Sequence, residues 1–320
     1  MHNNPNKKAR TKKPKQKLKS PLAMRDGVSA SRVWLPKDTN NEWKTILDFL
    51  VERFPFISSE TLQDRMSRGD IVNETGTPFN KHTPYQNECF LFYYREIPDE
   101  PEIPFKEEIL FKNENFIVVD KPHFIPVTPT GRYVKESLLA RLKHHYQNED
   151  ISPIHRLDRE TAGIVMFTCN PEVRGAYQTL FQKREVDKTY QAIAAISNLE
   201  FPLTHRSRII KSEPFFIMKE DKSVALDEIN SETEISVLET KGKLAKYELK
   251  PVTGKQHQLR VHMMSLGIPI LNDPFYPELL PCKGEEYSSP LQLLAKSIAF
   301  TDPVTGEARF FESRKSLKLK

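Results

Sequence analysis

A short polar run at residues 155–159, His-Arg-Leu-Asp-Arg, holds the side chains of this chain best suited to chemistry. Its acid, Asp158, stands between Arg156 and Arg159, and a nearby positive charge stabilises an ionised carboxylate. A positioned carboxylate can act as a nucleophile or as a general base. The apolar stretch 164–167 is typical of a buried strand, which would place the charged turn at the edge of a core. A surface ion pair of little energetic value is the alternative that the charge pattern alone favours.

A second polar stretch, residues 253–262, reads Thr-Gly-Lys-Gln-His-Gln-Leu-Arg-Val-His. It predicts a turn that feeds a helix ending near Gly267. His257 and His262 are five residues apart, which is not the spacing of a helical metal-binding pair. The chain shows no phosphate-binding or dinucleotide-binding glycine pattern either. We therefore expect neither a metal nor a cofactor.

The elements that must position these stretches can be predicted from hydrophobic periodicity and end signals. Residues 196–240 show no clean period, and we interpret them as a loop with short strands. The remaining pattern predicts a hairpin over 109–119, a helix over 134–146, a helix over 170–184 with Asn170 as its N-cap, and strands at 188–194, 244–251 and 291–300.

Upstream, the sequence predicts a small α+β module over residues 31–97. Helical periodicity begins at Trp43 and ends at Pro55, and a second helix runs from Ser58 or Ser59 to Arg68. Strands at 71–72 and 89–94 follow these two helices. Residues 98–104 are rich in proline and acid and predict a stiff, extended linker, after which a second domain spans 105–315.

Length and composition agree with a protein of about two domains that folds around its own core. The chain has 320 residues, of which 38% are hydrophobic, and no apolar run approaches the ~20 residues of a membrane span. Its cysteines, Cys89, Cys169 and Cys282, form no CxxC pair. This argues against disulfides or zinc and for a reducing compartment, so we expect a cytoplasmic protein without a membrane partner.

The positive charge of the chain is concentrated at its start. Residues 1–25 hold nine of the 48 Lys and Arg residues and no acid, so the rest of the chain has fewer bases than its 43 acids. Like-charged runs with Pro and Asn are usually disordered and often bind nucleic acid. We expect residues 1–30 to be a disordered basic tail, which either binds RNA or only keeps the protein soluble.

Taken in order, the motifs resemble those of the RluA-type pseudouridine synthases. The resemblance covers roughly residues 105–312 and includes a hairpin ending in Lys121-Pro122, the run His-Arg-Leu-Asp-x-x-Thr-x-Gly from residue 155, and Lys-x-Tyr-x-Ala from residue 188. The stretches 253–262 and 269–276 complete the series. Four positions depart from the family pattern, namely Lys255, Gln256, Asn272 and Leu294.

The resemblance implies an α+β fold, a mixed, mostly antiparallel sheet with packed helices. It implies that Asp158 is the nucleophile, that Tyr190 stacks on a flipped base and assists proton removal, and that Arg260 pairs with Asp158. Arg156 would contact the RNA backbone or fill the vacated stack. We expect the substrate-binding residues to be Arg156, His155, Lys255, His257, Gln258 and Leu293.

The activity that the resemblance implies is pseudouridine formation in structured RNA by base flipping, without a cofactor. Large-subunit, 23S-type ribosomal RNA is the expected substrate, with a tRNA stem-loop as the alternative, and we expect a monomer. A non-catalytic ribosome-assembly factor of the same fold is a second hypothesis. A glycosidase is a third, which needs two carboxylates, and here Glu160 is the nearby second acid. The upstream module resembles an RNA-binding module, on the basis of Arg65 and Arg68.

Overall fold

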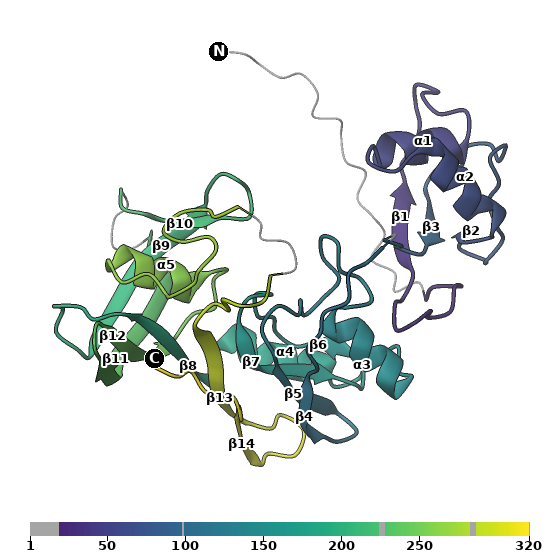
Figure 1. Cartoon of the computed structure of the whole chain (residues 1–320). Coiled ribbons are helices and arrows are strands. Elements are labelled where there is room, and N and C mark those ends of the chain that lie inside the picture. The colour runs from purple at the N-terminus through teal and green to yellow at the C-terminus, as the bar shows by residue number, and fades with distance from the viewer. Residues whose placement is uncertain (1–18, 98, 224–227, 282–285, 320) are drawn as a thin grey trace. The chain divides into compact units, whose positions relative to one another are not determined.

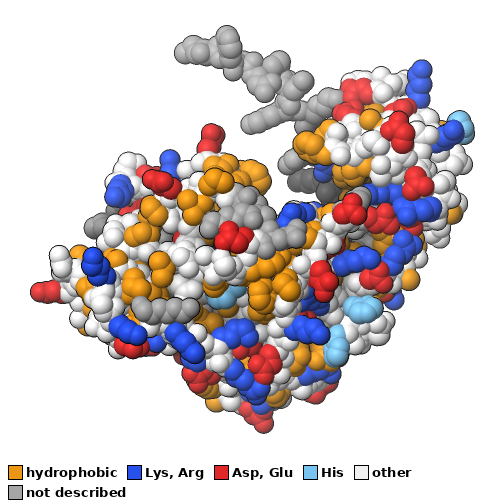
Figure 2. Space-filling view, viewed as in Figure 1, with side chains coloured by type: hydrophobic (Ala, Val, Ile, Leu, Met, Phe, Trp, Pro, Cys, Tyr) orange, Lys and Arg blue, Asp and Glu red, His pale blue; other side chains and the backbone are white. Residues whose placement is uncertain are grey.

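The computed structural model describes residues 19–97, 99–223, 228–281 and 286–319 (Figure 1). The chain divides into two compact units, residues 1–98 and 99–320, and each is described by itself. Within the described residues, no helix has both the length and the apolar character needed to cross a membrane. The face drawn in Figure 2 mixes acidic and basic side chains, as expected from the near balance of charge beyond residue 25.

The first unit packs two helices against a three-stranded antiparallel sheet. The core between them contains Leu35, Ile46, Leu50 and Leu91, all almost fully buried. The sheet has the order β1-β3-β2. The elements are β1 (Ser31–Leu35), α1 (Ile46–Arg53), α2 (Ser59–Ser67), β2 (Ile71–Asn73) and β3 (Cys89–Tyr93).

Capping residues decide where the two helices begin. The Thr45 side chain accepts from the Asp48 amide, and the Asp48 side chain accepts from the Thr45 amide, so α1 starts at Ile46 and not at Trp43 as predicted. Ser58 caps α2 and is one of the two serines at which the helix was predicted to begin. Strand β1 was not predicted as an element, because its five residues follow a stretch without clear periodicity.

The disordered tail was predicted to extend to residue 30, but the chain is already packed before that residue. Residues 1–18 lie outside the described residues, but Arg25 pairs with Asp70 at 2.9 Å and Val28 is buried. The predicted linker is also packed, since Ile103 is buried and the Glu100 carboxylate accepts hydrogen bonds from the backbone amides of residues 134–136. Residues 99–104 are therefore part of the second unit, whereas residue 98 lies outside the described residues.

Acidic partners occupy the two arginines that suggested RNA binding by the first unit. Arg65 is only 5% exposed and donates to the backbone carbonyl of Glu96. Arg68 forms ion pairs with Asp64, Asp70 and Glu96 at 2.9–3.3 Å. These pairs hold the module together, so the two arginines no longer support an RNA surface there.

The second unit is built on an eleven-stranded sheet of order β10-β9-β11-β12-β8-β13-β7-β5-β4, with β14 paired to β13 and β6 to β7. Among the described strands, only β13 and β7 are parallel, which confirms the predicted mixed, mostly antiparallel sheet. Its strands are β4 (Glu108–Lys112), β5 (Phe116–Lys121), β6 (Ser152–Pro153), β7 (Ala162–Thr168), β8 (Val186–Ala195), β9 (Leu203–Lys211), β10 (Met218–Asp221), β11 (Ser231–Lys241), β12 (Leu244–Pro251), β13 (Leu293–Thr301) and β14 (Ala308–Glu312).

Helices on both faces explain the apolar run of β7. Val165 and Phe167 pack in the cluster of α3 (Leu138–Tyr146), whereas Ile164 and Met166 pack in the cluster of α4 (Arg174–Lys183). Successive strand residues point to opposite faces, so a strand covered on both faces is apolar throughout. On the other half of the sheet, α5 (Gln258–Ser265) lies against β9, β10 and β11 (Figure 1). Its Leu259 and Met263 belong to a core cluster that also contains residues of β8 and β12.

Gly163 is required where β7 meets β13. Its φ is +108°, and a Cβ atom there would lie 2.2 Å from the carbonyl oxygen of Ala295. Only glycine therefore permits this pairing of the two strands. Gly163 lies five residues after Asp158, so this tight contact between β7 and β13 anchors the loop that carries Asp158.

Two predictions of local structure were wrong. Residues 196–240 are mostly long strands, β9 and β11, which alternate between a buried face and charged positions such as Arg206 and Glu232. The helix predicted from Asn170 begins at Arg174, because the Asn170 side chain accepts from Glu172 within a preceding turn.

Candidate active site

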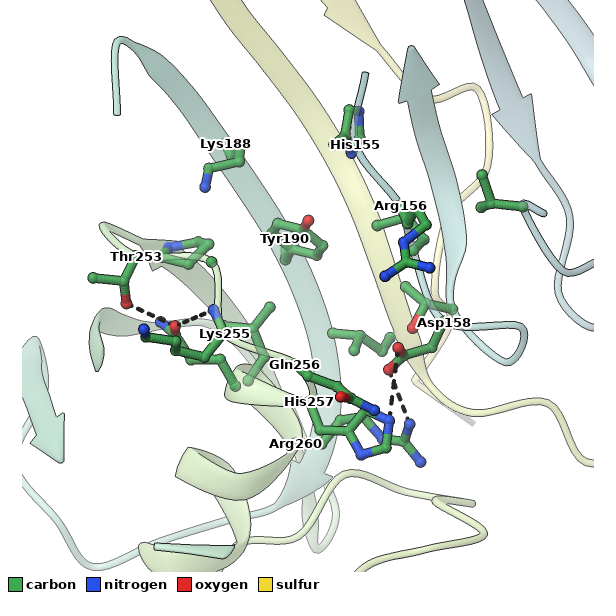
Figure 3. A pocket seen from close by; sticks show the side chains of 18 of the residues that line it. His155, Arg156, Asp158, Lys188, Tyr190, Thr253, Lys255, Gln256, His257 and Arg260 are labelled. Atoms are coloured by element: carbon green, nitrogen blue, oxygen red, sulfur yellow. Dashed lines mark hydrogen bonds and ion pairs between the residues drawn. The ribbon is translucent and has the colours of Figure 1, made fainter. Parts of the chain in front are cut away.

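A pocket of about 750 Å³ opens between the two halves of the second unit (Figure 3). The loop 155–161, strand β8, the loop 251–257 and the start of α5 contribute to its lining. The structure thus brings together the two polar stretches that the sequence indicated, although about 100 residues separate them. Its lining holds one acid, Asp158, and six bases, which are Arg156, Arg159, Arg184, Lys188, Lys255 and Arg260.

Asp158 is held by a guanidinium between two carboxylates. Arg260 Nη1 donates to Asp158 Oδ2 at 2.9 Å, as predicted, while Nε and Nη2 bind the two oxygens of Asp273 at 2.8 and 2.6 Å. The side chains of Arg260 and Asp273 are 1% and 0% exposed, but that of Asp158 is 28% exposed. Burial opposes the charge of Arg260, yet the hydrogen bond to Asp273 and the charge of Asp158 raise its pKa. The guanidinium therefore stays charged and orients the one carboxylate that faces the pocket.

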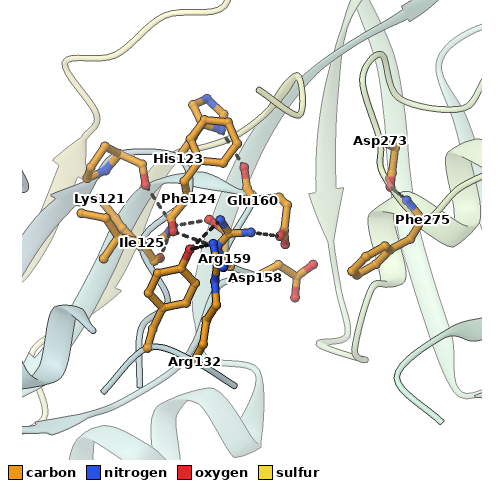
Figure 4. A network of polar contacts seen from close by, with 12 residues as sticks. Lys121, His123, Phe124, Ile125, Arg132, Asp158, Arg159, Glu160, Asp273 and Phe275 are labelled. Carbon is orange, nitrogen blue, oxygen red and sulfur yellow. Dashed lines mark hydrogen bonds and ion pairs between the residues drawn. The ribbon is translucent and has the colours of Figure 1, made fainter. Parts of the chain in front are cut away.

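A buried lysine supports the loop that carries Asp158 (Figure 4). Lys121 Nζ donates to the carbonyls of Pro122, Ile125 and Arg159 at 2.9–3.2 Å, and its side chain is fully buried. Burial lowers the pKa of Lys121 to about 7, although the charges of Glu160 and Asp158 oppose this. The three carbonyl contacts connect the end of β5 to the residue that follows Asp158.

Arg159 is directed away from Asp158 and anchors the other side of the loop. Its Nε donates to the carbonyl of Phe124 at 3.1 Å, and its Nη1 lies 3.3 Å from Glu160 (Figure 4). Arg159 therefore pairs with Glu160 and not with Asp158. Arg156 is exposed at the pocket, where it is available to a ligand.

Tyr190 lies on β8 and its ring faces the same pocket (Figure 3). Within the described residues, its hydroxyl has no hydrogen-bond partner. Burial raises the pKa of Tyr190, and the nearby charge of Asp158 raises it further. The phenol therefore stays protonated near neutral pH, which suits stacking and hydrogen-bond donation better than direct removal of a proton.

His257 also lies close to Asp158. Its Nε2 lies 3.7 Å from Asp158 Oδ1, and its Nδ1 is 2.8 Å from the Tyr276 hydroxyl. Burial lowers the pKa of His257, and the charge of Asp158 only partly offsets this. The ring is therefore neutral near pH 7. His262, the other histidine of the motif, is fully buried and bonds to the hydroxyls of Ser207, Ser231 and Thr233.

Two predicted substrate-binding residues use their polar atoms within the protein. His155 accepts from the Met166 amide and stacks on Phe181, and burial lowers its pKa to about 3. Gln258 accepts from Thr253 and Lys255 and donates to Glu232 and Thr233. Both line the pocket, but their bonds shape its walls.

The other two predicted contacts differ in exposure. Lys255 is exposed at the pocket, and Leu293 is 3% exposed in its wall. The sequence reasoning missed Asp273 and Tyr276 as site residues, although both stand in the motif at 269–276. It also missed the role of Lys121. A family motif marks such positions, but their contacts depend on packing between distant segments.

The fold and pocket define an α+β protein with an aspartate held at the side of a basic pocket. Residues 115–265 match the family described as RNA pseudouridylate synthase. The dual-specificity RNA pseudouridine synthase RluA of Salmonella typhi is 32% identical over 217 residues, which are 64% of this chain and 91% of that protein. The chain belongs to the RluA-type pseudouridine synthase family, which confirms the resemblance seen in its motifs.

Other relatives are longer than the matched region. Pseudouridylate synthase RPUSD2 of Mus musculus is 33% identical over 171 residues, 52% of this chain and 30% of that protein. The mitochondrial tRNA pseudouridine(32) synthase of Saccharomyces cerevisiae is 29% identical over 245 residues, 73% of this chain and 50% of that protein. The chain thus spans half or less of the length of these two relatives. The structure of human RNA pseudouridylate synthase domain containing 1 shares the fold, with a TM-score of 0.55, 24% identity, and coverage of 67% of this chain and 86% of that one.

Proposed function

We propose that the protein isomerises uridine to pseudouridine in structured RNA, with Asp158 as the nucleophile. The observation that supports this most is the placement of Asp158. Its carboxylate is oriented by buried Arg260 at 2.9 Å, yet it remains 28% exposed to a pocket whose other charged residues are Lys and Arg. A basic pocket suits the phosphates around a target nucleotide, and a fixed carboxylate suits nucleophilic attack.

The reaction balances with the groups that the pocket holds. If Asp158 attacks the anomeric carbon, the bond from that carbon to N1 breaks and the base carries the negative charge. The base then turns, its C5 bonds to the anomeric carbon, and the carboxylate leaves. The proton on C5 is lost and N1 gains one, so nothing is oxidised or imported. Attack on C6 of the ring also transfers the charge of Asp158 to the base.

In this proposal, Tyr190 stacks on the flipped base. Extrusion of a stacked uridine costs a few kcal/mol, and an aromatic ring recovers about 1–3 kcal/mol per base by stacking. The ring of Tyr190 faces the pocket on the rigid strand β8, and no other protein group bonds its hydroxyl among the described residues. Its raised pKa favours stacking and hydrogen bonding over the role of a free base.

The two other classes of function find less support in the site. A glycosidase needs a second carboxylate at the substrate. Among the described residues that line the pocket, however, Asp158 is the one acid, Glu160 binds Arg159, and Asp273 is buried against Arg260. A non-catalytic RNA-binding factor would not need Asp158, Tyr190 and Arg260 together in one pocket.

We propose large-subunit ribosomal RNA as the first substrate and a tRNA stem-loop as the second. The name of the yeast relative supports the second, and the name of the Salmonella relative allows for more than one RNA. Mapping of pseudouridine across all cellular RNA, with and without the protein, identifies the target. Loss of sites confined to messenger RNA would contradict both substrates.

The test of the activity is Asp158→Asn, which keeps size and removes the nucleophilic charge. We expect normal folding and RNA binding but no release of tritium from C5 of labelled uridine. Binding should be equal or tighter, because the carboxylate repels phosphate. The matched control is Glu160→Gln, which neutralises an adjacent acid outside the reaction. Substantial release by Asp158→Asn with an unchanged melting curve would show that Asp158 is not the nucleophile.

A further inference from the structure

A line of polar contacts runs from β10 to the catalytic carboxylate. The Met218 amide donates to the Tyr276 hydroxyl at 2.9 Å, and this hydroxyl lies 2.8 Å from His257 Nδ1. On the other side of the ring, His257 Nε2 lies 3.7 Å from Asp158 Oδ1. Tyr276 is 3% exposed and His257 is 9% exposed, so water does not replace these partners.

The direction of these hydrogen bonds determines where the ring proton resides. A backbone amide can only donate, so the Tyr276 oxygen accepts from Met218. If Nδ1 of His257 also donated, the Tyr276 proton would have no acceptor among the described residues, at a cost of about 1–3 kcal/mol. Tyr276 therefore donates to Nδ1, and the proton of the neutral imidazole is on Nε2.

The two oxygens of Asp158 have different surroundings. Oδ2 accepts from Arg260 at 2.9 Å, whereas Oδ1 accepts no hydrogen bond from any described residue. The 3.7 Å separation from His257 is longer than a hydrogen bond. Oδ1 is therefore the oxygen available for attack, and a neutral N–H group stands beside it.

We infer that His257 is a hydrogen-bond donor to the reacting uridine, held as the Nε2–H tautomer by Tyr276. This inference rests on the proposed function and adds a role within it. Whichever carbon Asp158 attacks, negative charge passes from Oδ1 to the base, and a donor placed beside Oδ1 stabilises that charge. A neutral ring serves this purpose better than a charged one, since an imidazolium would form an ion pair with Oδ1 before the attack. Tyr276 is then a positioning residue.

Two substitutions of His257 separate this role from packing. The amide nitrogen of Gln reaches the position of Nε2, whereas that of Asn reaches the position of Nδ1. We expect His257→Gln to keep kcat within about tenfold of the wild type and His257→Asn to lose roughly 100-fold or more, the usual effect of removing one such donor. KM for the RNA should change little in both, because many contacts share the binding.

The ring itself can be examined in the wild-type protein. Nitrogen-15 NMR of labelled histidine, assigned by the signals that His257→Gln removes, should show Nε2 with a proton and Nδ1 without one. Tyr276→Phe keeps the ring and removes the hydroxyl, so we expect kcat to fall about tenfold or less at constant KM. A protonated Nδ1 in the wild type would overturn the assignment.

The controls separate this inference from the proposed function. If Asp158→Asn is inactive but His257→Gln and His257→Asn lose equal activity, Asp158 is the nucleophile and His257 is not the donor. If Asp158→Asn retains activity, the proposed function fails first. Melting curves of all variants identify any loss of folding, and the NMR result on the unmodified chain holds even where a variant does not fold.

Discussion

Asp273 binds Arg260 through Nε and Nη2, at 2.8 and 2.6 Å, and thereby leaves Nη1 for Asp158. The backbone amides of Phe275 and Tyr276 also donate to Asp273 Oδ1. The ring of Phe275 covers the guanidinium at 4.7 Å. A fully buried carboxylate thus fixes the plane of the arginine, and that plane fixes the carboxylate of Asp158.

Removal of the Asp273 charge should therefore affect both stability and rate. Asp273→Asn leaves a buried guanidinium partly unpaired, and breaking a buried pair costs about 3–5 kcal/mol when one partner is lost. We expect a lower melting temperature and a lower kcat, measured by thermal denaturation and tritium release. Glu232→Gln is the matched control, because its pair with Arg206 is half-exposed and should contribute little. Equal effects of the two substitutions would contradict the role given to Asp273.

Tyr190 should act mainly through its ring. Tyr190→Phe keeps the stacking surface, so we expect KM for the RNA to stay near that of the wild type and kcat to fall modestly. Tyr190→Ala loses stacking worth about 1–3 kcal/mol, which corresponds to a loss of roughly 5- to 150-fold in kcat/KM. Steady-state kinetics on one RNA hairpin measures both. If Tyr190→Phe lowers kcat/KM as much as Tyr190→Ala does, the hydroxyl and not the ring is the important group.

The buried amine of Lys121 should make stability depend on pH. Its pKa in the folded protein is about 7, below the value of about 10.4 for an unfolded lysine. Between these values the unfolded chain binds a proton that the folded chain does not, so this group makes the free energy of unfolding rise with pH. Below pH 7 the folded protein bears the full cost of a buried ammonium.

Urea denaturation between pH 6 and 9.5 tests this linkage. We expect wild type to gain stability relative to Lys121→Met as pH rises through the window. Lys255→Met, at an exposed position, is the control and should follow the wild type. A constant difference between wild type and Lys121→Met at all pH values would show that the amine keeps its charge when buried.

The basic start of the chain should add electrostatic affinity alone. Deletion of residues 1–18 removes seven Lys and Arg residues. We expect weaker RNA binding and a smaller salt dependence, because fewer counterions are released, with kcat at saturating RNA unchanged. Binding measured at several salt concentrations and single-turnover rates check this. A complete loss of turnover at saturation would assign the segment a structural role.

Much of the local structure follows from the sequence because its signals are local. The strand predicted at 244–251 is β12, whose fully buried residues alternate with mostly half-buried ones, as the period of a strand requires. Ser58 begins α2 because its hydroxyl accepts from the Thr61 amide. The run around Asp158 is also visible without the fold, although its charge pattern alone favours a surface ion pair and only its resemblance to a family motif points to a site.

The tertiary structure alone decides which partners these residues take. The sequence places Arg159 beside Asp158, yet Arg159 binds Phe124 and Glu160, and Arg260, 102 residues away, holds the carboxylate. The resemblance to a family anticipated that pair, but no local pattern contains it. The same holds for Lys121, which reaches Pro122 and Ile125 in the segment that follows it but also Arg159, 38 residues away. Such contacts arise only when β5, β7 and α5 pack together, because burial determines which charges must find a partner.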